Sequence, residues 1–137
     1  MILFINMDLF LKYNQQIAED LKCSSLNIKE AQMLLPSKKH FWVARLIEQK
    51  VNLTNLKKKK DKLVKALIDN KQTNSPVALS KINLEKMCHA NETVDKLTEE
   101  IKETEMVVEY LEKVEKIFSA MTYDYKNIVE LMKMEQM

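Results

Sequence analysis

Hydrophobic side chains recur at every third or fourth position along most of this chain, a spacing that places them on one face of an α-helix. The first such run spans residues 7–22, and a second, shorter run covers residues 28–35. Pro36 follows the second run and disfavours helical geometry in the residue before it. Residues 1–36 are therefore predicted to form short N-terminal helices.

Two longer amphipathic runs follow, and the polar segment 71–78, which contains Pro76, separates them as a predicted loop. The first run predicts a long helix over residues 37–70, and the second predicts another over residues 79–118. Their apolar positions are spaced alternately by three and four, as in coiled coils. Two such helices joined by a short loop are expected to pack antiparallel as a hairpin.

The last apolar run predicts a separate C-terminal helix over residues 122–137, after a break between Ser119 and Thr122. No segment alternates hydrophobic and polar residues over a length that is typical of a β-strand. We therefore expect a single all-α domain over residues 1–137, built on the long helical hairpin.

Charge is divided unevenly between the two long helices. Residues 38–71 contain eleven Lys or Arg and three Asp or Glu, a net charge of +8, whereas residues 82–118 contain five Lys and ten Asp or Glu, a net charge of −5. The whole chain carries only +2. A basic helix of this kind points to a polyanionic partner, because its lysines neutralise phosphates and release their counterions.

The lysines are densest in the second half of the basic helix. Lys58, Lys62 and Lys65 stand at i, i+4 and i+7, so they share one helix face, with no alternating acid to pair them. Their repulsion is unfavourable unless an anion lies over them. Lys60 occupies a leucine position of the coiled-coil pattern, so its charge must reach outward or meet a partner. A solvated helix face and an acidic protein partner are the alternatives to nucleic acid. The predicted nucleic-acid-binding residues are Lys57, Lys58, Lys59, Lys60, Lys62, Lys65 and Arg45.

An aromatic pair, Phe41 and Trp42, lies close to Lys38, Lys39 and Arg45 in the sequence. Aromatic rings beside basic side chains hold single strands by stacking on the bases. Packing of Trp42 in the hydrophobic core is the other interpretation, and the sequence leaves both open.

Several classes of catalytic site are excluded by composition. The sequence contains no glycine, which phosphate-binding loops and dinucleotide fingerprints require. Cys23 and Cys88 lack the spacing of metal ligands and are typical of reduced cytosolic thiols, and His40 and His89 are isolated. We expect no enzymatic activity, no metal and no cofactor. The apolar segment 1–11 is too short to span a bilayer, so we expect no membrane partner.

Apolar residues near the C-terminus form a stripe that is longer than one partner helix can cover. Self-association is the economical way to bury the remainder, so we expect a homo-oligomer. The predicted oligomerisation residues are Leu111, Val114, Phe118, Tyr125, Ile128 and Met132.

Three short segments resemble parts of the UvsY-type recombination mediators of T-even-like phages. Residues 119–130 (SAMTYDYKNIVE) are similar to the final segment of that family, residues 25–28 (SLNI) to its N-terminal region, and residues 63–68 (LVKALI) to its basic segment. Length and helix order agree as well, so the resemblance covers most of the chain. Lys65 matches a basic position of the family, whereas Leu67 stands where the family often has arginine.

The resemblance implies a non-enzymatic accessory of homologous recombination. Such mediators form ring-like homo-oligomers of the hexamer or heptamer class, bind single-stranded DNA, and help a phage recombinase displace the single-strand binding protein. By this likeness the lysines upstream of Lys65 supply the phosphate contact that is missing at Leu67. The same likeness implies that residues 111–132 serve self-assembly. It also implies that the protein works in the cytoplasm of the infected bacterial host. The alternative is a structural coiled-coil scaffold or adaptor that binds an acidic protein.

Overall fold

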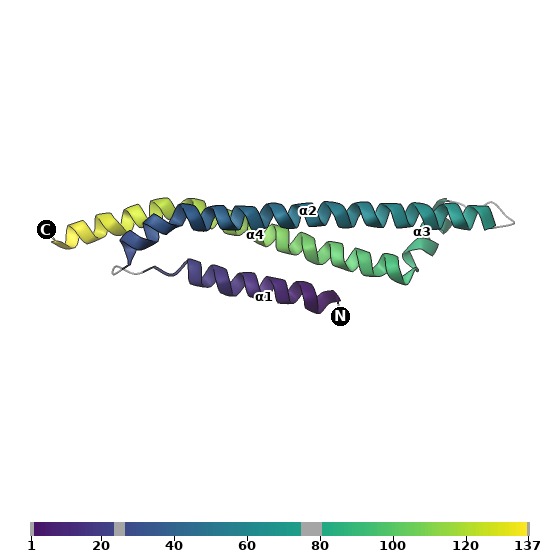
Figure 1. The fold of residues 1–137 in the computed structure, drawn as a ribbon, viewed down its shortest axis with the longest axis horizontal. Coiled ribbons are helices and arrows are strands. Elements are labelled where there is room, and N and C mark those ends of the chain that lie inside the picture. The colour runs from purple at the N-terminus through teal and green to yellow at the C-terminus, as the bar shows by residue number, and fades with distance from the viewer. Residues whose placement is uncertain (1, 24–26, 75–80, 137) are drawn as a thin grey trace.

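A computed structural model of the chain describes residues 2–23, 27–74 and 81–136. These residues form four α-helices and no strand: α1 (Ile2–Asp20), α2 (Ile28–Asn74), α3 (Lys81–His89) and α4 (Glu92–Gln136). The two long helices α2 and α4 run antiparallel along an elongated molecule, and α1 lies beside them over one part of its length (Figure 1). The predicted all-α class and the packing of the long helix against the C-terminal helix are confirmed.

Helix α2 is longer than the sequence pattern predicts, since it runs over 47 residues with Pro36 inside it. The predictions of a helix end at Pro36 and of a loop beginning at residue 71 are therefore wrong, while residues 75–80 of that loop lie outside the described residues. Pro36 removes one backbone hydrogen bond, but Ile28, Ala31 and Leu35 before it are buried in the same core as the turns after it. The first turns of α2 are bent away from the axis of the rest, as expected for a proline kink (Figure 1).

Helix α4 is also continuous where the sequence predicts a break. The chain passes through Ser119–Thr122 as regular helix, because Phe118, Met121 and Tyr125 continue the buried three-and-four spacing without interruption. The predicted helix over residues 79–118 and the separate helix over residues 122–137 are corrected accordingly.

The acidic helix that the sequence predicts over residues 79–118 is interrupted earlier, between α3 and α4. The Asn91 side-chain oxygen accepts hydrogen bonds from the backbone N–H groups of Thr93 (2.9 Å) and Val94 (3.2 Å). This is the arrangement of a helix N-cap, which satisfies backbone donors that have no partner in the first turn. Asn91 therefore starts α4 afresh and lets α3 leave at an angle.

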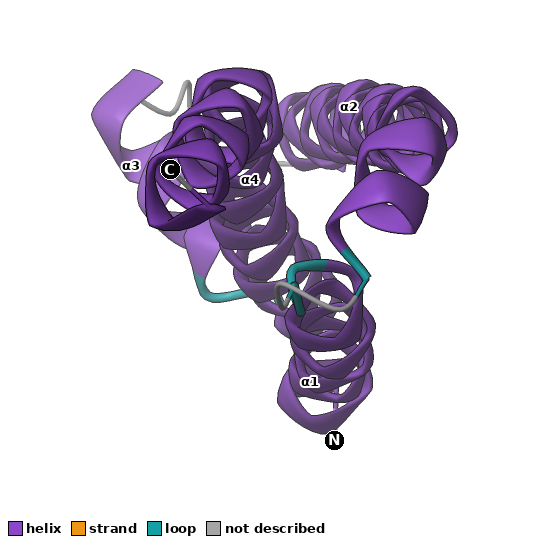
Figure 2. Cartoon of the chain, turned by 90° about the vertical axis from the view of Figure 1, so that its left-hand side faces the viewer, coloured by secondary structure: helices purple, strands orange, loops and turns teal. Residues whose placement is uncertain are grey.

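The hydrophobic core is divided unequally along the long axis. We call α1, residues 28–53 of α2 and residues 107–132 of α4 the three-helix region, because they share one large buried cluster. Seen along the long axis, α1, α2 and α4 occupy the corners of a triangle (Figure 2). We call residues 56–74 of α2, α3 and residues 92–104 of α4 the arm. Its α2–α4 contact holds a smaller cluster of Leu56, Leu97 and Ile101.

The helices were also compared with the dimensions of a bilayer. Within the described ranges, none of them combines the length and the apolar character that crossing a membrane requires.

Candidate nucleic-acid interface

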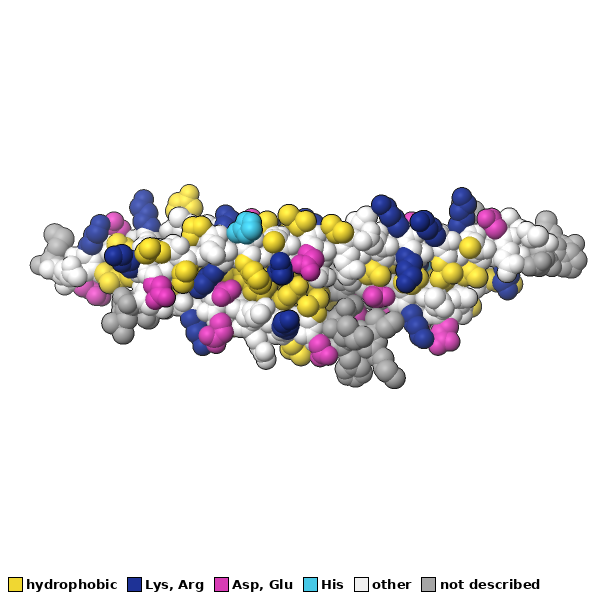
Figure 3. All heavy atoms as spheres, viewed as in Figure 1, with side chains coloured by type: hydrophobic (Ala, Val, Ile, Leu, Met, Phe, Trp, Pro, Cys, Tyr) yellow, Lys and Arg dark blue, Asp and Glu magenta, His cyan; other side chains and the backbone are white. Residues whose placement is uncertain are grey.

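The side of α2 that faces away from α4 carries Lys58, Lys62 and Lys65, with Lys59 at its flank. Leu56 and Leu63 pack toward α4, and Lys58 and Lys65 each follow one of these leucines by two residues. Two residues turn an α-helix by about 200°, so the lysines lie nearly opposite the leucines. Figure 3 shows several Lys or Arg side chains standing out from the outer edge of α2 over the arm.

Four lysines form this surface, which we call the lysine face. They are exposed, and none makes an ion pair with a described residue. They are Lys58, Lys59, Lys62 and Lys65. The shared face that the sequence predicts for Lys58, Lys62 and Lys65 follows from α2 being continuous helix through this stretch. The surface therefore presents several positive charges that no carboxylate in the described part of the chain neutralises.

Lys57 is turned toward α4 instead. Its ammonium lies 3.4 Å from a carboxylate oxygen of Glu105, and Lys50 lies 3.4 Å from Glu112 in the same way. All four side chains are about half exposed, so each pair stabilises the fold by less than roughly 1 kcal/mol. These pairs lie between α2 and α4, and they withdraw Lys57 from the predicted site.

Arg45 lies in the three-helix region and is not brought to the lysine face. Its guanidinium stacks 4.7 Å from the centre of the Phe41 ring, and its Nε lies 3.1 Å from a carboxylate oxygen of Glu48. Lys58 is thirteen residues further along α2, which is about 20 Å at the rise of an α-helix. Arg45 and the lysines would therefore contact different parts of any ligand.

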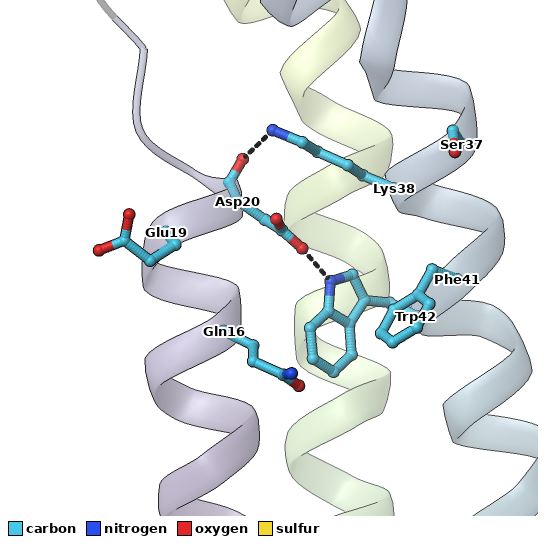
Figure 4. Close-up of a pocket in the computed structure, with 7 residues that line it drawn as sticks. All are labelled: Gln16, Glu19, Asp20, Ser37, Lys38, Phe41 and Trp42. Carbon is cyan, nitrogen blue, oxygen red and sulfur yellow. Dashed lines mark hydrogen bonds between the residues drawn. The ribbon is translucent and has the colours of Figure 1, made fainter.

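Trp42 is a core residue, so the packing interpretation of the aromatic pair is the one that the structure supports. Its ring is only 1% exposed, and the ring of Tyr13 lies edge-on to it at 5.5 Å. The indole N–H donates to the Asp20 carboxylate at 2.8 Å, and the Lys38 ammonium donates to the Asp20 carbonyl at 3.3 Å. Figure 4 shows both side chains of α2 converging on Asp20 at the end of α1. This contact fixes α1 to α2.

The same burial affects the ionisation of Tyr13. Desolvation raises the pKa of its phenol above the ordinary value, and the hydrogen bond from Gln49 works against this rise. Burial also raises the pKa of Tyr110 and of Tyr125. All three belong to the three-helix region.

The predicted oligomerisation stripe is covered within the chain itself. Its members Leu111, Val114 and Phe118 are each 1% exposed and Tyr125 is 4% exposed, while Ile128 and Met132 are partly buried against the same cluster. The premise that one hairpin leaves this stripe uncovered is wrong, because α1 packs on α4 as a third helix. Self-assembly stays a prediction, but it needs another surface.

Sequence reasoning missed a groove where α3 meets the lysine-rich part of α2. It brings His89 and Cys88 beside Lys60 and Lys65, and its volume is about 380 Å³. The periodicity argument treated residues 79–118 as one helix and so placed no turn before Asn91. Asn91 is a good N-cap residue, and it is the signal that could have revealed the turn between α3 and α4.

The described residues contain no cluster of three or more His, Cys, Asp or Glu side chains that could hold a metal ion. What they do present is a run of unneutralised ammonium groups on a rigid helix. No protein-family model, curated protein or solved structure matches the chain. The chemistry of this surface must therefore carry the functional argument.

Proposed function

We propose that the chain binds single-stranded DNA through the lysine face and acts as a recombination mediator, without chemistry of its own. The observation that carries the binding proposal is the set of exposed lysines at Lys58, Lys62 and Lys65 with no ion pair to a described residue. Like charges one turn apart destabilise a helix by roughly 0.2–0.5 kcal/mol per pair. A phosphate backbone over this face would turn that repulsion into attraction.

The internal comparison with Lys50 and Lys57 supports a functional reason for the lysine face. Both of those lysines lie against α4 and are matched by its glutamates. The lysines on the outer side of the same helix are left unmatched. The resemblance to UvsY-type mediators supports the further steps of the proposal, namely single-strand preference, a phage recombinase and a single-strand binding protein as partners, and the cytoplasm of an infected bacterium as the location.

A ring-like homo-oligomer is part of the same proposal. Since the C-terminal stripe is buried, the apolar surface left for assembly on α4 consists of exposed side chains on its outer side. They are Met106, Ile117, Tyr123, Leu131 and Met134, with exposed fractions between 47% and 72%. A native mass of six or seven chains in solution is the expected result, and a native mass of one chain would remove assembly from the proposal.

A scaffold that binds an acidic protein is the second candidate. It is favoured by Ile47 and Val51, which are 56% and 54% exposed on α2 upstream of the lysine face. On a helical wheel they fall on the same side as Lys58 and Lys62. An amphipathic acidic helix could cover apolar and basic positions together, whereas a nucleic acid needs only the basic ones.

Titration with single-stranded and duplex DNA of equal length over a range of salt concentrations distinguishes the two candidates. The mediator proposal expects tighter binding of the single strand and a logarithmic affinity that falls linearly with the logarithm of salt concentration. Weak binding without strand preference would favour the scaffold. A second assay follows recombinase filament formation on single strands coated with the cognate single-strand binding protein. The delay before filaments form should shorten when the chain is added.

A further inference from the structure

The groove between α2 and α3 is built from both helices. From α2 it is lined by Lys60, Asp61, Val64, Lys65 and Ile68, and from α3 by Cys88 and His89. Its volume of about 380 Å³ falls within the range of small-ligand clefts, roughly 300–1,000 Å³. The groove therefore combines aliphatic side chains with two ammonium groups, one imidazole and the Asp61 carboxylate.

Packing holds the α3 wall of the groove in place. Leu84 and Cys88 are each 3% exposed, and the Cys88 thiol lies 3.9 Å from the Val64 carbonyl oxygen, which it faces as a weak donor. The Asn91 cap then redirects the chain into α4. His89, the last residue of α3, is exposed next to this fixed point. Its imidazole lines the groove together with Lys60 and Lys65.

Lys60 gives the groove its electrostatic character. It occupies a leucine position of the seam and is half-buried, yet no carboxylate of the described residues lies within 4.0 Å of its ammonium. The seam-side lysines Lys50 and Lys57 on the same helix do have glutamate partners. Asp61 lines the same groove but forms no ion pair with Lys60. A partly desolvated charge without an ion pair is unfavourable, so an anion in contact with Lys60 would stabilise it.

We propose that this groove holds one nucleotide of the bound single strand. Its phosphodiester lies between the ammonium groups of Lys60 and Lys65 and the imidazole of His89, and its sugar and base lie against Val64 and Ile68. This inference rests on the proposed function and adds a place where the strand leaves the lysine face. Lys65 belongs to both the face and the groove, so it connects them. Because Val64 and Ile68 are aliphatic, the base is held without hydrogen-bond readout, and no sequence preference is expected.

Single substitutions in the groove test the proposal against matched controls. Lys60→Gln and His89→Gln each remove one group of the groove, whereas Lys71→Gln on α2 and Lys86→Gln on α3 alter exposed residues of the same two helices outside it. Affinity for an oligothymidylate is measured by fluorescence anisotropy, with helix content checked by circular dichroism. We expect Lys60→Gln to weaken binding roughly 5- to 10-fold and to reduce the salt slope by about one unit, with both controls within about 2-fold of the unchanged protein. His89→Gln should weaken binding about 3-fold.

Photocrosslinking gives a readout that a general loss of charge would not move. An oligothymidylate carrying one 5-iododeoxyuridine is irradiated with the full-length protein, and the crosslinked peptides are identified by mass spectrometry. Crosslinks are expected in peptides that contain residues 64–68 or 88–89. Groove variants that bind as tightly as the controls, or crosslinks confined to other peptides, would overturn the groove while the proposed function stands. A wild-type protein that does not bind the oligonucleotide at all would overturn both.

Discussion

The three-helix region and the arm are built from the same two long helices, but they differ in what covers them. In the three-helix region α1 closes the third side, and Trp42, Leu111 and Phe118 are each only 1% exposed. In the arm α2 and α4 have no cover from α1, and Leu56, Leu97 and Ile101 form a small aliphatic cluster. The first region buries large aromatic side chains, which contribute most to stability. The second buries only aliphatic side chains in its α2–α4 contact, and its outer side of α2 carries the lysine face.

The three-helix region, which contributes most to stability, is therefore not the region that we propose to bind DNA. Repulsion between lysines on an exposed helix costs little folding stability, and α2 places these lysines far from the buried aromatic rings. The ion pairs Lys50–Glu112 and Lys57–Glu105 mark the transition, because they lie between α2 and α4 just before the lysine face begins. A rigid three-helix region thus supports an arm whose outer surface is available to a polyanion.

The largest expected effect concerns the core of the three-helix region. Phe118→Ala should lower the free energy of unfolding by about 3–5 kcal/mol, because it leaves a cavity under a fully buried ring. Leu97→Ala in the arm should cost about 2 kcal/mol, near the lower end for buried leucine, because a thin two-helix contact can relax around the cavity. Urea denaturation followed by circular dichroism measures both. An equal or larger loss for Leu97→Ala would show that stability is not concentrated in the three-helix region.

The second prediction concerns the lysine face. Combined replacement of Lys58, Lys62 and Lys65 by alanine should weaken single-strand binding roughly 30- to 100-fold and lower the salt slope by about two to three units. The free energy of unfolding should stay within about 0.5 kcal/mol or rise, since alanine favours helix and the repulsion is removed.

The matched control replaces three lysines of α4, Lys96, Lys113 and Lys116, and changes the net charge by the same amount. Lys96 and Lys113 are paired with glutamates of their own helix. This control should keep most of the affinity and most of the salt slope. If both triple variants lose affinity equally, net charge alone governs binding and the lysine face has no special role.

A smaller effect is expected where α1 is fixed to α2. Asp20→Ala leaves the buried indole N–H of Trp42 without its acceptor and should cost about 1–3 kcal/mol. Asp20→Asn keeps an acceptor oxygen and should cost less. Trp42 is the only tryptophan, so intrinsic fluorescence reports this contact directly, and its emission should move to longer wavelength in Asp20→Ala. An unshifted spectrum with unchanged stability would mean that the contact does not hold α1.

The smallest prediction uses the buried tyrosine of the three-helix region. Burial raises the pKa of Tyr13 above its value in the unfolded chain, so the folded state holds the phenolic proton more tightly. The resulting stability is fully present below about pH 10, the unfolded pKa, and is lost as the pH rises through the folded pKa. Melting temperature should therefore fall less steeply above pH 10 in Tyr13→Phe than in the unchanged protein. Tyr123→Phe, at a residue that is 72% exposed, should leave the slope as it is.

Local rules of sequence predicted the helical class and the long amphipathic helices, and the shared side of Lys58, Lys62 and Lys65 follows from helix periodicity alone. They failed where burial overrides local preference. Pro36 is carried inside α2 because Leu35 and its neighbours are buried together with the turns that follow. Phe118 is covered by α1, and this packing joins segments that are distant in the sequence. Helix periodicity carries no information about such contacts. The groove at His89 depends on the direction in which α3 leaves α4, and only the Asn91 cap hints at it in the sequence.

Acetylation of individual lysines, with and without bound oligothymidylate, tests the central claim most directly. The rate at each lysine is followed by mass spectrometry under limiting reagent, so that every ammonium group reports its own contact. The account predicts protection at Lys58, Lys62 and Lys65, with unchanged rates at Lys113 and Lys126 of α4. Protection that spreads evenly over the chain, or that concentrates on α4, would contradict the assignment of DNA binding to the lysine face.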